Sequence, residues 1–417
     1  MSIQVNHEFL SPDHGAQEVV ERKGLGHPDT LVDGIVEATE IAYAKYCREN
    51  FGAIPHHNLD KATLVGGLCV QQFGGGDFEQ PLKMIFLGRA SRTFGSKEIP
   101  LDDIQNSVTK QYLSRILPHL DTQDPTVYQW ESQTSTRSTR PYWFSPRTID
   151  DLPEYSGKSP RANDTATMIS YWPLTTTEKL ALDIEGFFYG DDENGLPHPR
   201  FELIGQDIKV MCVRNGDQLS ATVCVPQITT HTSSESAYYE REDDITRELE
   251  GYVASLSANE SLEINLTVNS QTKGPNPHPY LVTGGSCTDF GEEGAVGRGN
   301  KTHGIISSFR PNTMEAPHGK NPTYFVGKVL GYQADIISKA IYESTGSRCQ
   351  IVLQANMGDD LFDPSNIIVS TEDDVPSKDV DSIVAKCLGI GRQTTDLIID
   401  SGHFIPRTNA WSPSDQS

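Results

Sequence analysis

The chain has 417 residues, of which 22% are charged and 36% hydrophobic. It is therefore long enough for two or three domains, and its composition is typical of a folded globular protein. The formal net charge of −23 excludes nucleic-acid binding through a general basic surface. An anionic substrate would have to be held by a local group of Lys and Arg side chains, against the field of the whole protein.

Cysteine usage and the N-terminus both bear on the compartment. The seven cysteines are scattered, odd in number and never form Cys-x-x-Cys, which favours free thiols in a reducing compartment. Residues 1–7 have neither the basic nor the apolar region of a signal peptide. No apolar run approaches the ~18–20 residues that span a bilayer. The sequence predicts a cytoplasmic protein with no membrane and no nucleic-acid partner.

The first strong pattern along the chain covers residues 19–52. After an extended run and two glycines, a helix is predicted to begin at Pro28, because proline suits a first helical position, and to end at Gly52. His27 and Asp29 then lie at the helix N-terminus, where free N–H groups and the helix dipole favour anions. This combination indicates a metal–phosphate site, although both residue types are also common as simple helix caps.

Strands and helices alternate along the rest of the chain. Two strands at 62–73 and 83–90 flank the glycines 74–76, which would admit a ligand close to the backbone or simply connect a hairpin. Asn215-Gly216 between two alternating strands predicts a type I′ hairpin turn. Further helices are predicted at 102–117, 177–185, 245–256, 322–341 and from about 378, and further strands at 208–213, 219–225, 262–268, 350–355 and 366–370.

One long helix followed by hairpin strands occurs about three times. This recurrence predicts an α+β fold of three similar units with antiparallel sheets, with approximate cores at 17–120, 160–270 and 280–400. Residues 121–160 are rich in Thr, Ser, Pro and Asp and show little periodicity. They predict a long irregular excursion, and a loop of that length is usually functional or mobile.

Several catalytic motifs are absent. The sequence contains no P-loop, no Gly-x-Gly-x-x-Gly between a strand and a helix, and no Gly-x-Ser-x-Gly. The pair His56-His57 lacks a companion at metal-ligand spacing, which favours structural or surface histidines over a zinc site. What remains is a set of charged residues of both signs near glycines, which suits a polyphosphate with divalent cations. They are Lys23, His27, Asp29, Asp207, Lys209, Arg298, Lys301 and Lys320.

At these residues the sequence resembles the archaeal-type S-adenosylmethionine synthetases (methionine adenosyltransferases), over roughly residues 17–400. The order and spacing of the matching stretches agree throughout. They are Val-Glu-Arg-Lys-Gly-Leu-Gly-His-Pro-Asp at 20–29, Phe-Gly-Gly-Gly and Gly-Arg-Ala within 73–90, Ala-Asn-Asp-Thr at 162–165, Pro-Leu-Thr-Thr-Thr-Glu at 173–178, Asp-Ile-Lys-Val-Met at 207–211, Val-Gly-Arg-Gly-Asn-Lys at 296–301, Arg-Pro at 310–311 and Met-Glu-Ala-x-x-Gly-Lys-Asn-Pro at 314–322.

The resemblance implies three similar, intertwined α+β units and a homodimer with active sites at the subunit interface. It also implies that ATP and L-methionine react to give S-adenosylmethionine and tripolyphosphate, which is hydrolysed to diphosphate and phosphate, with Mg²⁺ and in many members K⁺. A thioether sulfur is already nucleophilic, so no protein nucleophile is needed. This agrees with the absence of nucleophile motifs.

The resemblance also implies roles for individual residues. His27 would contact the leaving oxygen, Lys209, Arg298 and Lys320 would grip phosphates, and Asp29 and Asp207 would hold Mg²⁺. Substrate contacts are implied at Lys23, Gly75, Gln133, Ser135, Asn163, Asp164, Glu292 and Lys301.

Three segments depart from the family pattern, and they gather where the nucleobase and the amino acid should bind. Glu292-Glu293-Gly294 replaces Asp-Asp-Gly, Ser132-Gln133-Thr134-Ser135 replaces Gly-Gln-Gly-Ser, and Leu68-Cys69-Val70-Gln71 replaces His-Ala-Tyr-Pro. Three hypotheses follow: an S-adenosylmethionine synthetase with neutral changes, an enzyme that adenosylates another acceptor or hydrolyses ATP or tripolyphosphate, and a non-catalytic ATP-binding paralogue. The retained phosphate residues speak against the third.

Overall fold

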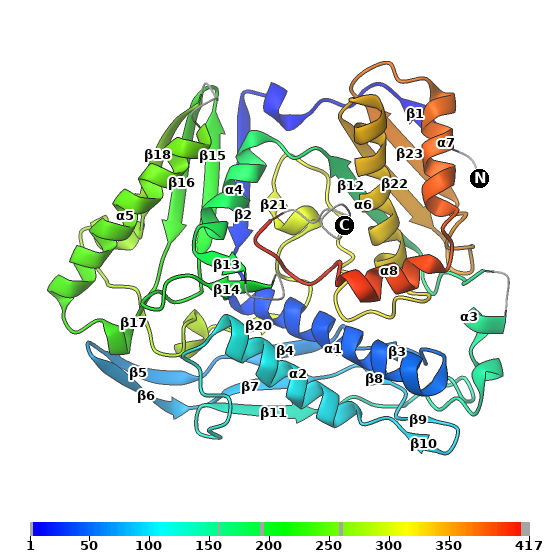
Figure 1. Ribbon diagram of the computed structural model, residues 1–417, viewed down its shortest axis with the longest axis horizontal. Coiled ribbons are helices and arrows are strands. Elements are labelled where there is room, and N and C mark those ends of the chain that lie inside the picture. The colour runs from blue at the N-terminus through cyan, green and yellow to red at the C-terminus, as the bar shows by residue number, and fades with distance from the viewer. Residues whose placement is uncertain (1–2, 157–158, 192–195, 258–261, 410–417) are drawn as a thin grey trace.

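Three sheets with their helices surround a central region in the computed structural model, which describes residues 3–156, 159–191, 196–257 and 262–409 (Figure 1). Most strand pairs are antiparallel, and the predicted α+β class is confirmed. The helices α1, α4 and α6 border the central region, which the yellow and red segments of the chain cross (Figure 1). None of the helices within the described ranges is long and apolar enough to cross a membrane.

The first sheet has the strand order β11-β7-β4-β20. Its side chains alternate between the two faces, as in any strand, and Leu64, Met84 and Phe86 are fully buried on the face that α1 and α2 cover. The elements are α1 (Pro28–Phe51), β4 (Ala62–Val65), β7 (Leu82–Phe86), α2 (Leu101–Ile116), β11 (Tyr128–Ser132) and β20 (Gly294–Ala295).

The second sheet has the order β18-β16-β15-β2-β21. Asn215 pairs with Gln218, so the hairpin loop is Gly216-Asp217, one residue later than the Asn-Gly pair predicts. Gly216 has a φ of +55°, which glycine adopts without strain. The elements are β2 (Gln17–Lys23), α4 (Thr176–Gly186), β15 (Lys209–Asn215), β16 (Gln218–Cys224), α5 (Glu235–Ser257), β18 (Glu263–Val268) and β21 (Ile306–Ser307).

The third sheet has the order β1-β23-β22-β12 and packs against α6 and α7. The elements are β1 (Ile3–Asn6), β12 (Ala166–Trp172), α6 (Val326–Thr345), β22 (Cys349–Ala355), β23 (Asn366–Thr371), α7 (Ser377–Leu388) and, after it, α8 (Gln393–Ser401). Smaller elements are β3 (His57–Asn58), β5 (Leu68–Gln72), β6 (Gly75–Gln80), β8 (Arg89–Ala90), β9 (Thr93–Phe94), β10 (Lys97–Glu98), α3 (Pro153–Ser156), β13 (Tyr189–Asp191), β14 (Pro197–Pro199), β17 (Gln227–Ile228) and β19 (Leu281–Val282).

The three sheets share one plan. In each, an outer strand runs parallel to the second strand of an antiparallel pair, and a fourth, antiparallel strand flanks the other side. The strand that precedes each unit's first helix lies in another unit's sheet: β2 precedes α1, β12 precedes α4, and β20 lies before α6. The sheets are therefore intertwined, and each of the expected ranges 17–120, 160–270 and 280–400 contributes strands to more than one sheet.

Two stretches that the sequence left ambiguous have defined structures. The glycines at 74–76 belong to a hairpin between β5 and β6, in which Gly74 has a φ of +87° and Gly75 begins β6. Residues 121–160 hold β11, a single 3-10 turn at Ile149–Asp151 and α3, and are otherwise irregular in their described part.

Candidate active site

The start of α1 lies against the segment that leads into β15. The backbone N–H groups of Gly24 and Gly26 donate to Ile208 O (2.8 Å) and Gln206 O (3.0 Å). A Cβ on Gly26 would come within 2.3 Å of Gln206 O, so only glycine permits this approach. His27 is the N-cap residue of α1, and its Nδ1 accepts a hydrogen bond from Asp29 N at 3.2 Å.

His27 is neutral at pH 7. Burial lowers the pKa of its imidazole, and this outweighs the opposite effects of Asp207 and Asp29, while the charges of Lys23 and Lys209 lower it further. Asp29 Oδ2 lies 4.0 Å from His27 Nδ1, and Lys23 Nζ lies 2.9 Å from the same carboxylate oxygen. Since Nδ1 accepts from the backbone, the ring proton lies on Nε2, which can donate it to an oxygen of a bound substrate.

Asp29 is a carboxylate held on both oxygens. Lys23 Nζ lies 2.9 Å from Oδ2 and also donates to Arg298 O at 2.7 Å, and Ala295 N donates to Oδ1 at 3.0 Å. Burial raises the pKa of Asp29, but the hydrogen bonds from Ala295 N and Lys23 outweigh it, so the pKa is lowered. The start of α1 therefore keeps a fixed negative charge beside a fixed positive one.

Asp207 has one oxygen free of protein partners. It is buried, and its Oδ2 accepts from the Tyr280 hydroxyl at 2.5 Å, whereas Oδ1 is buried and has no hydrogen-bond partner in the described part of the chain. Burial raises the pKa of the neighbouring Cys287 thiol, and the charges of Asp207 and Glu292 add to this effect. Glu292, which is exposed, therefore lies on the Asp207 side of the site.

A second group of predicted residues lies near the start of α6. Lys320 is buried, pairs with Glu315, and has its Nζ 4.9 Å above the Phe325 ring. Asn163 Oδ1 accepts from Val326 N, the first residue of α6, at 2.9 Å. The structure thus brings Asn163 and Lys320 to the same helix end.

Two buried side chains connect the two groups. Burial lowers the pKa of His318 to about 3, and Lys328, Lys320 and Lys301 act in the same direction. Burial raises the pKa of Asp33 to about 7, and the negative charge of Asp29 adds to the rise. Hydrogen bonds from backbone N–H groups and the positive charge of Lys301 oppose it. His318 Nδ1 lies 3.4 Å from Asp33 Oδ1 on α1, and the same oxygen accepts from Gly297 N at 2.7 Å. Lys301 Nζ donates to Gly297 O at 2.9 Å.

The structure leaves five predicted residues outside these contacts. Gly75 lies in the β5–β6 hairpin, and Asp164 accepts from Thr165 N at 2.7 Å, within its own turn. Gln133 Nε2 donates to Glu131 at 2.6 Å, and the backbone of Ser135 bonds to Gly88 and Ala90, so both lie beside β8. The Arg298 side chain is exposed and has no ion pair among the described residues. Apart from Arg298 O, which accepts from Lys23 Nζ at 2.7 Å, none of these residues has a hydrogen bond or ion pair with the α1 group in the described chain.

The two adjacent histidines have structural roles, as the sequence favoured. Both are fully buried. His56 contacts Trp143 O (2.7 Å) and Glu154 (3.0 Å), and His57 contacts Glu40 (3.2 Å).

Sequence reasoning missed several partners of the predicted residues. Lys209 Nζ lies 3.1 Å from Glu21, and Asn300 bonds both the N–H (3.0 Å) and the C=O (2.7 Å) of Lys23. Glu21 could have been found from alternation along β2, which places it on the same face as Lys23. Tyr280 follows a Pro-rich stretch and carries no local signal of its contact with Asp207.

Divalent metal binding was tested against these contacts. In the described ranges, no three His, Cys, Asp or Glu side chains converge as a ready metal-ligand set. Mg²⁺, however, is usually held by one or two carboxylates together with waters and substrate phosphates. The partnerless Oδ1 of Asp207 fits that role, whereas Asp29 would have to exchange Lys23 for the ion.

Comparisons with known proteins point to one family. The family model for S-adenosylmethionine synthetase (AdoMet synthetase) matches residues 2–400. S-adenosylmethionine synthases of Methanocaldococcus jannaschii and Haloarcula marismortui are 31% and 32% identical to this chain. The former match covers 93% of each chain and the latter 88%. An uncharacterized protein of Streptococcus pyogenes serotype M3 is 51% identical, over 99% of this chain and all of its own.

A solved structure has the same fold. It is described as an unusual S-adenosylmethionine synthetase from Campylobacter jejuni, with a TM-score of 0.54 and 13% sequence identity. The match covers 94% of this chain and 90% of the other.

Proposed function

Because the chain belongs to the S-adenosylmethionine synthetase family, we propose that it is a cytoplasmic methionine adenosyltransferase. It would transfer the adenosyl group of ATP to the sulfur of L-methionine and release diphosphate and phosphate by way of tripolyphosphate. One observation carries this proposal: His27 caps the start of α1 through Asp29 N, beside the ion pair in which Lys23 Nζ lies 2.9 Å from Asp29 Oδ2.

The proposed step needs charge placement rather than a base. The methionine sulfur attacks C5′ of the ribose, the C5′–O bond breaks, and its electron pair leaves with the triphosphate, so that the sulfur becomes a sulfonium and no proton is transferred from it. The barrier lies in the charge that develops on the leaving oxygen. The Nε2–H of His27 would donate to that oxygen, a contact that strengthens as the bond breaks.

The lysines of the site supply the opposite charge. At ~4 Å, one ion pair is worth ~4 kcal/mol at an effective dielectric of about 20. Lys23, Lys209 and Lys320 each pair with a carboxylate, namely Asp29, Glu21 and Glu315. These ion pairs hold the ammonium groups in place, and a triphosphate would compete with the carboxylates for them.

The expected cofactors are Mg²⁺ and K⁺. Asp207, and Asp29 once it has exchanged Lys23, would hold Mg²⁺, which would neutralise phosphate charge. No residue is assigned to K⁺.

A homodimer is part of the proposal. The face of the first sheet opposite α1 and α2 carries exposed apolar side chains, and the β5–β6 hairpin adds Leu68 and Val70, which are 40% and 51% exposed. Apolar surface of this kind marks protein–protein contacts. A second copy on this face would explain why Gln133 and Ser135 make no contact with the α1 group of their own chain. It would allow each chain to complete its partner's site.

A second candidate function rests on Glu292. This side chain is exposed on the Asp207 side of the site, where the resemblance implies a shorter Asp beside the methionine amino group. The longer side chain favours an altered acceptor, with ATP as the adenosyl donor in either case.

One experiment separates the hypotheses. The purified protein is incubated with ATP, Mg²⁺ and K⁺, with and without methionine, and the products are identified by mass spectrometry. S-adenosylmethionine that appears only with methionine supports the proposal. Methionine-independent release of tripolyphosphate or phosphate supports a different acceptor or hydrolysis, and ATP binding without turnover supports a non-catalytic paralogue.

A further inference from the structure

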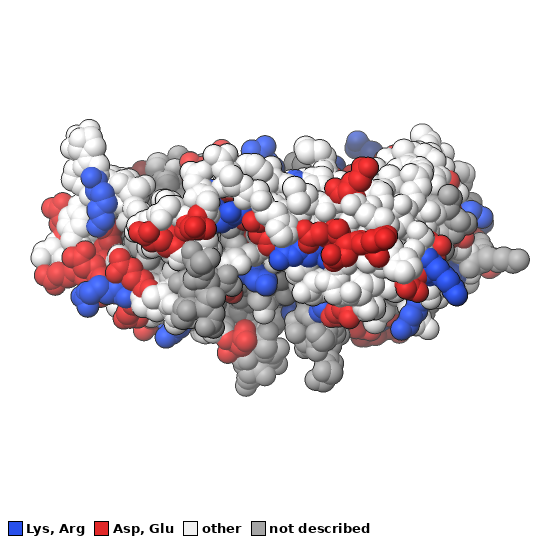
Figure 2. Space-filling view, turned by 90° about the horizontal axis from the view of Figure 1, so that it is seen from above, with Lys and Arg blue, Asp and Glu red and all other residues white. Residues whose placement is uncertain are grey.

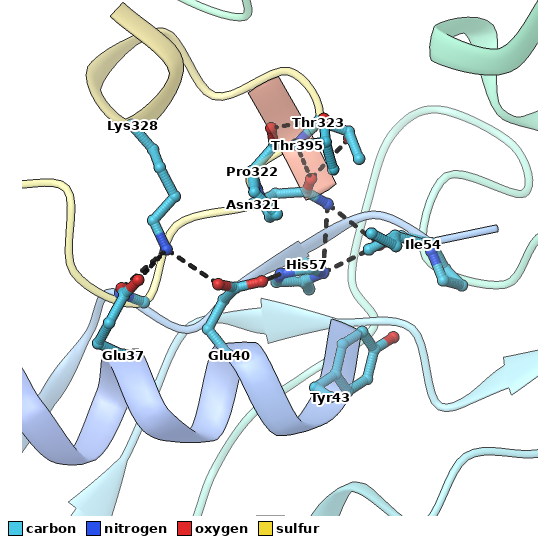
Figure 3. Close-up of polar contacts among 12 residues, drawn as sticks. Glu37, Glu40, Tyr43, Ile54, His57, Asn321, Pro322, Thr323, Lys328 and Thr395 are labelled. Atoms are coloured by element: carbon cyan, nitrogen blue, oxygen red, sulfur yellow. Dashed lines mark hydrogen bonds and ion pairs between the residues drawn. The ribbon is translucent and has the colours of Figure 1, made fainter. Parts of the chain in front are cut away.

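A buried ionic network joins α1 to α6 (Figure 3). Lys328 Nζ on α6 lies 2.8 and 2.7 Å from the two carboxylate oxygens of Glu37 and 2.9 Å from Glu40, three residues further along α1. All three side chains are fully buried. Replacing such a network with well-packed apolar residues is often neutral or stabilising, so stability alone is a weak reason for it.

The network reaches the residue before Lys320. Gly319 N donates to Glu37 Oε2 at 2.9 Å, and Gly319 O accepts from Leu59 N at 2.9 Å. Gly319 has a φ of +71°, and a Cβ there would lie 2.7 Å from Leu59 O. The peptide groups on both sides of Gly319 are therefore fixed, one by a buried carboxylate of α1.

The network also reaches the residue after Lys320. His57 Nε2 lies 3.2 Å from Glu40 Oε1, and Nδ1 of the same ring lies 3.2 Å from Asn321 Nδ2 (Figure 3). Asn321 Nδ2 also donates to Pro55 O at 3.1 Å. Lys320 therefore stands between two anchored neighbours.

The same helix carries the other end of the candidate site. Glu37 follows His27 by ten residues, so at 1.5 Å per residue the two are ~15 Å apart along α1. A rigid helix thus sets the spacing between the group that contacts the leaving oxygen and the anchor of Lys320.

We propose that Glu37 is a positioning residue for Lys320: through Gly319 it fixes the backbone that aims this ammonium group at the phosphate chain. The inference deepens the proposed function, since it rests on Lys320 as a phosphate ligand. Lys328 Nζ donates to both carboxylate oxygens of Glu37, and Oε2 also accepts from Gly319 N at 2.9 Å.

Binding of Mg²⁺–tripolyphosphate, measured by isothermal titration calorimetry, tests the proposal without requiring turnover. Glu37→Asp keeps the charge that Lys328 needs but withdraws the carboxylate from Gly319 N by one methylene. We expect about tenfold weaker binding in Glu37→Asp, as for a small misplacement of a binding group. In the Lys320→Ala background the same change should have no further effect.

Glu18→Asp is the matched control. Glu18 is also buried and paired with an arginine, Arg214 (2.9 Å), but lies at the far end of β2. Binding should be unchanged in this variant. Should Glu37→Asp fail to fold by circular dichroism, Glu37→Gln, which keeps an acceptor for Gly319 N, should bind within about threefold of the wild type.

Three results would overturn the proposal: multiplicative losses in the double variant, an equal loss in Glu18→Asp, or no tripolyphosphate binding by the wild type. Product analysis on the same samples separates this inference from the proposed function. The expected binding pattern without S-adenosylmethionine would reject only the function. S-adenosylmethionine formation without coupling between Glu37 and Lys320 would reject only the positioning role.

Discussion

His27 combines two roles that one substitution can separate. Its Nδ1 caps α1 by accepting from Asp29 N, and its Nε2–H is the proposed donor to the leaving oxygen. An N-cap side chain is worth ~1 kcal/mol of stability. A donor aimed at a developing oxyanion is worth a factor of ~10²–10³ in turnover, or about 3–4 kcal/mol.

Asparagine is among the best N-cap residues but is too short to place a donor where Nε2 lies. We expect His27→Asn to keep the wild-type unfolding free energy and to lower kcat by ~10²–10³. His27→Ala loses both groups, so its kcat should fall similarly and its stability by ~1 kcal/mol.

The assay measures S-adenosylmethionine formation at saturating ATP and methionine, with urea denaturation on the same preparations. Because burial lowers the pKa of His27, the neutral imidazole is the donor, and protonation of His27 should not shape the rate above pH 7. Turnover of His27→Asn within about threefold of the wild type would remove His27 from the reaction.

Three further predictions concern other parts of the chain. Burial raises the pKa of Asp33 to about 7 in the folded state, against ~3.9 in the unfolded chain. The contribution of Asp33 to the free energy of unfolding is therefore fully present below pH ~4 and is lost as the pH rises to 7. At 1.36 kcal/mol per pKa unit, the full contribution is ~4 kcal/mol. Urea denaturation at pH 5 and 8 should show that the unfolding free energy of Asp33→Asn depends less on pH than that of the wild type. An equal dependence would contradict the reasoning. Val70→Lys places a charge on the apolar hairpin; if the proposed homodimer forms there, the wild type should sediment as a dimer and the variant as a monomer, and equal sedimentation would contradict this interface. If Glu292 shifts the amino-acid end of the site, Glu292→Asp should raise kcat/KM for methionine severalfold, and an unchanged value would exclude it from acceptor selection.

Local signals were sufficient for individual helices. Pro28 and Gly52 mark the ends of α1, and the structure places the helix between Pro28 and Phe51 with Gly52 at a φ of +68°. Capping and 3.6-residue periodicity depend on neighbours in sequence, so they can be read without the fold. Strand pairing cannot: β2 pairs with β15 almost two hundred residues later, and β1 with β23 across most of the chain. Neither pairing has a local pattern.

The candidate site was predictable to the same extent. The sequence placed a helix start at His27-Pro28-Asp29, which the structure shows, but it gave no sign that Gly24 and Gly26 lie against residues 206–208, next to Asp207. Alternation along β2 could have indicated Glu21, but Glu315 was not predictable, because it looks like any surface carboxylate until the fold brings Lys320 beside it. The charges on the face shown in Figure 2 do not indicate an anion-binding site: Asp and Glu side chains form clusters, and Lys and Arg lie singly or in small groups among them.

The positions of the site residues in the fold give a physical reason why the phosphate end of the site keeps the family's residues while the acceptor end departs from them. Lys23 and Lys209 come from paired strands of the second sheet, and Lys320 from the segment between β21 of that sheet and α6. Lys23 donates to Arg298 O and the backbone of Lys320 pairs with Asn58, so changes at these two positions act on contacts between distant parts of the chain. Glu292 instead lies on an exposed segment, where substitutions alter few packed neighbours. Departures at the acceptor end are therefore compatible with an intact phosphate end, and ATP remains the expected adenosyl donor whichever nucleophile accepts the group.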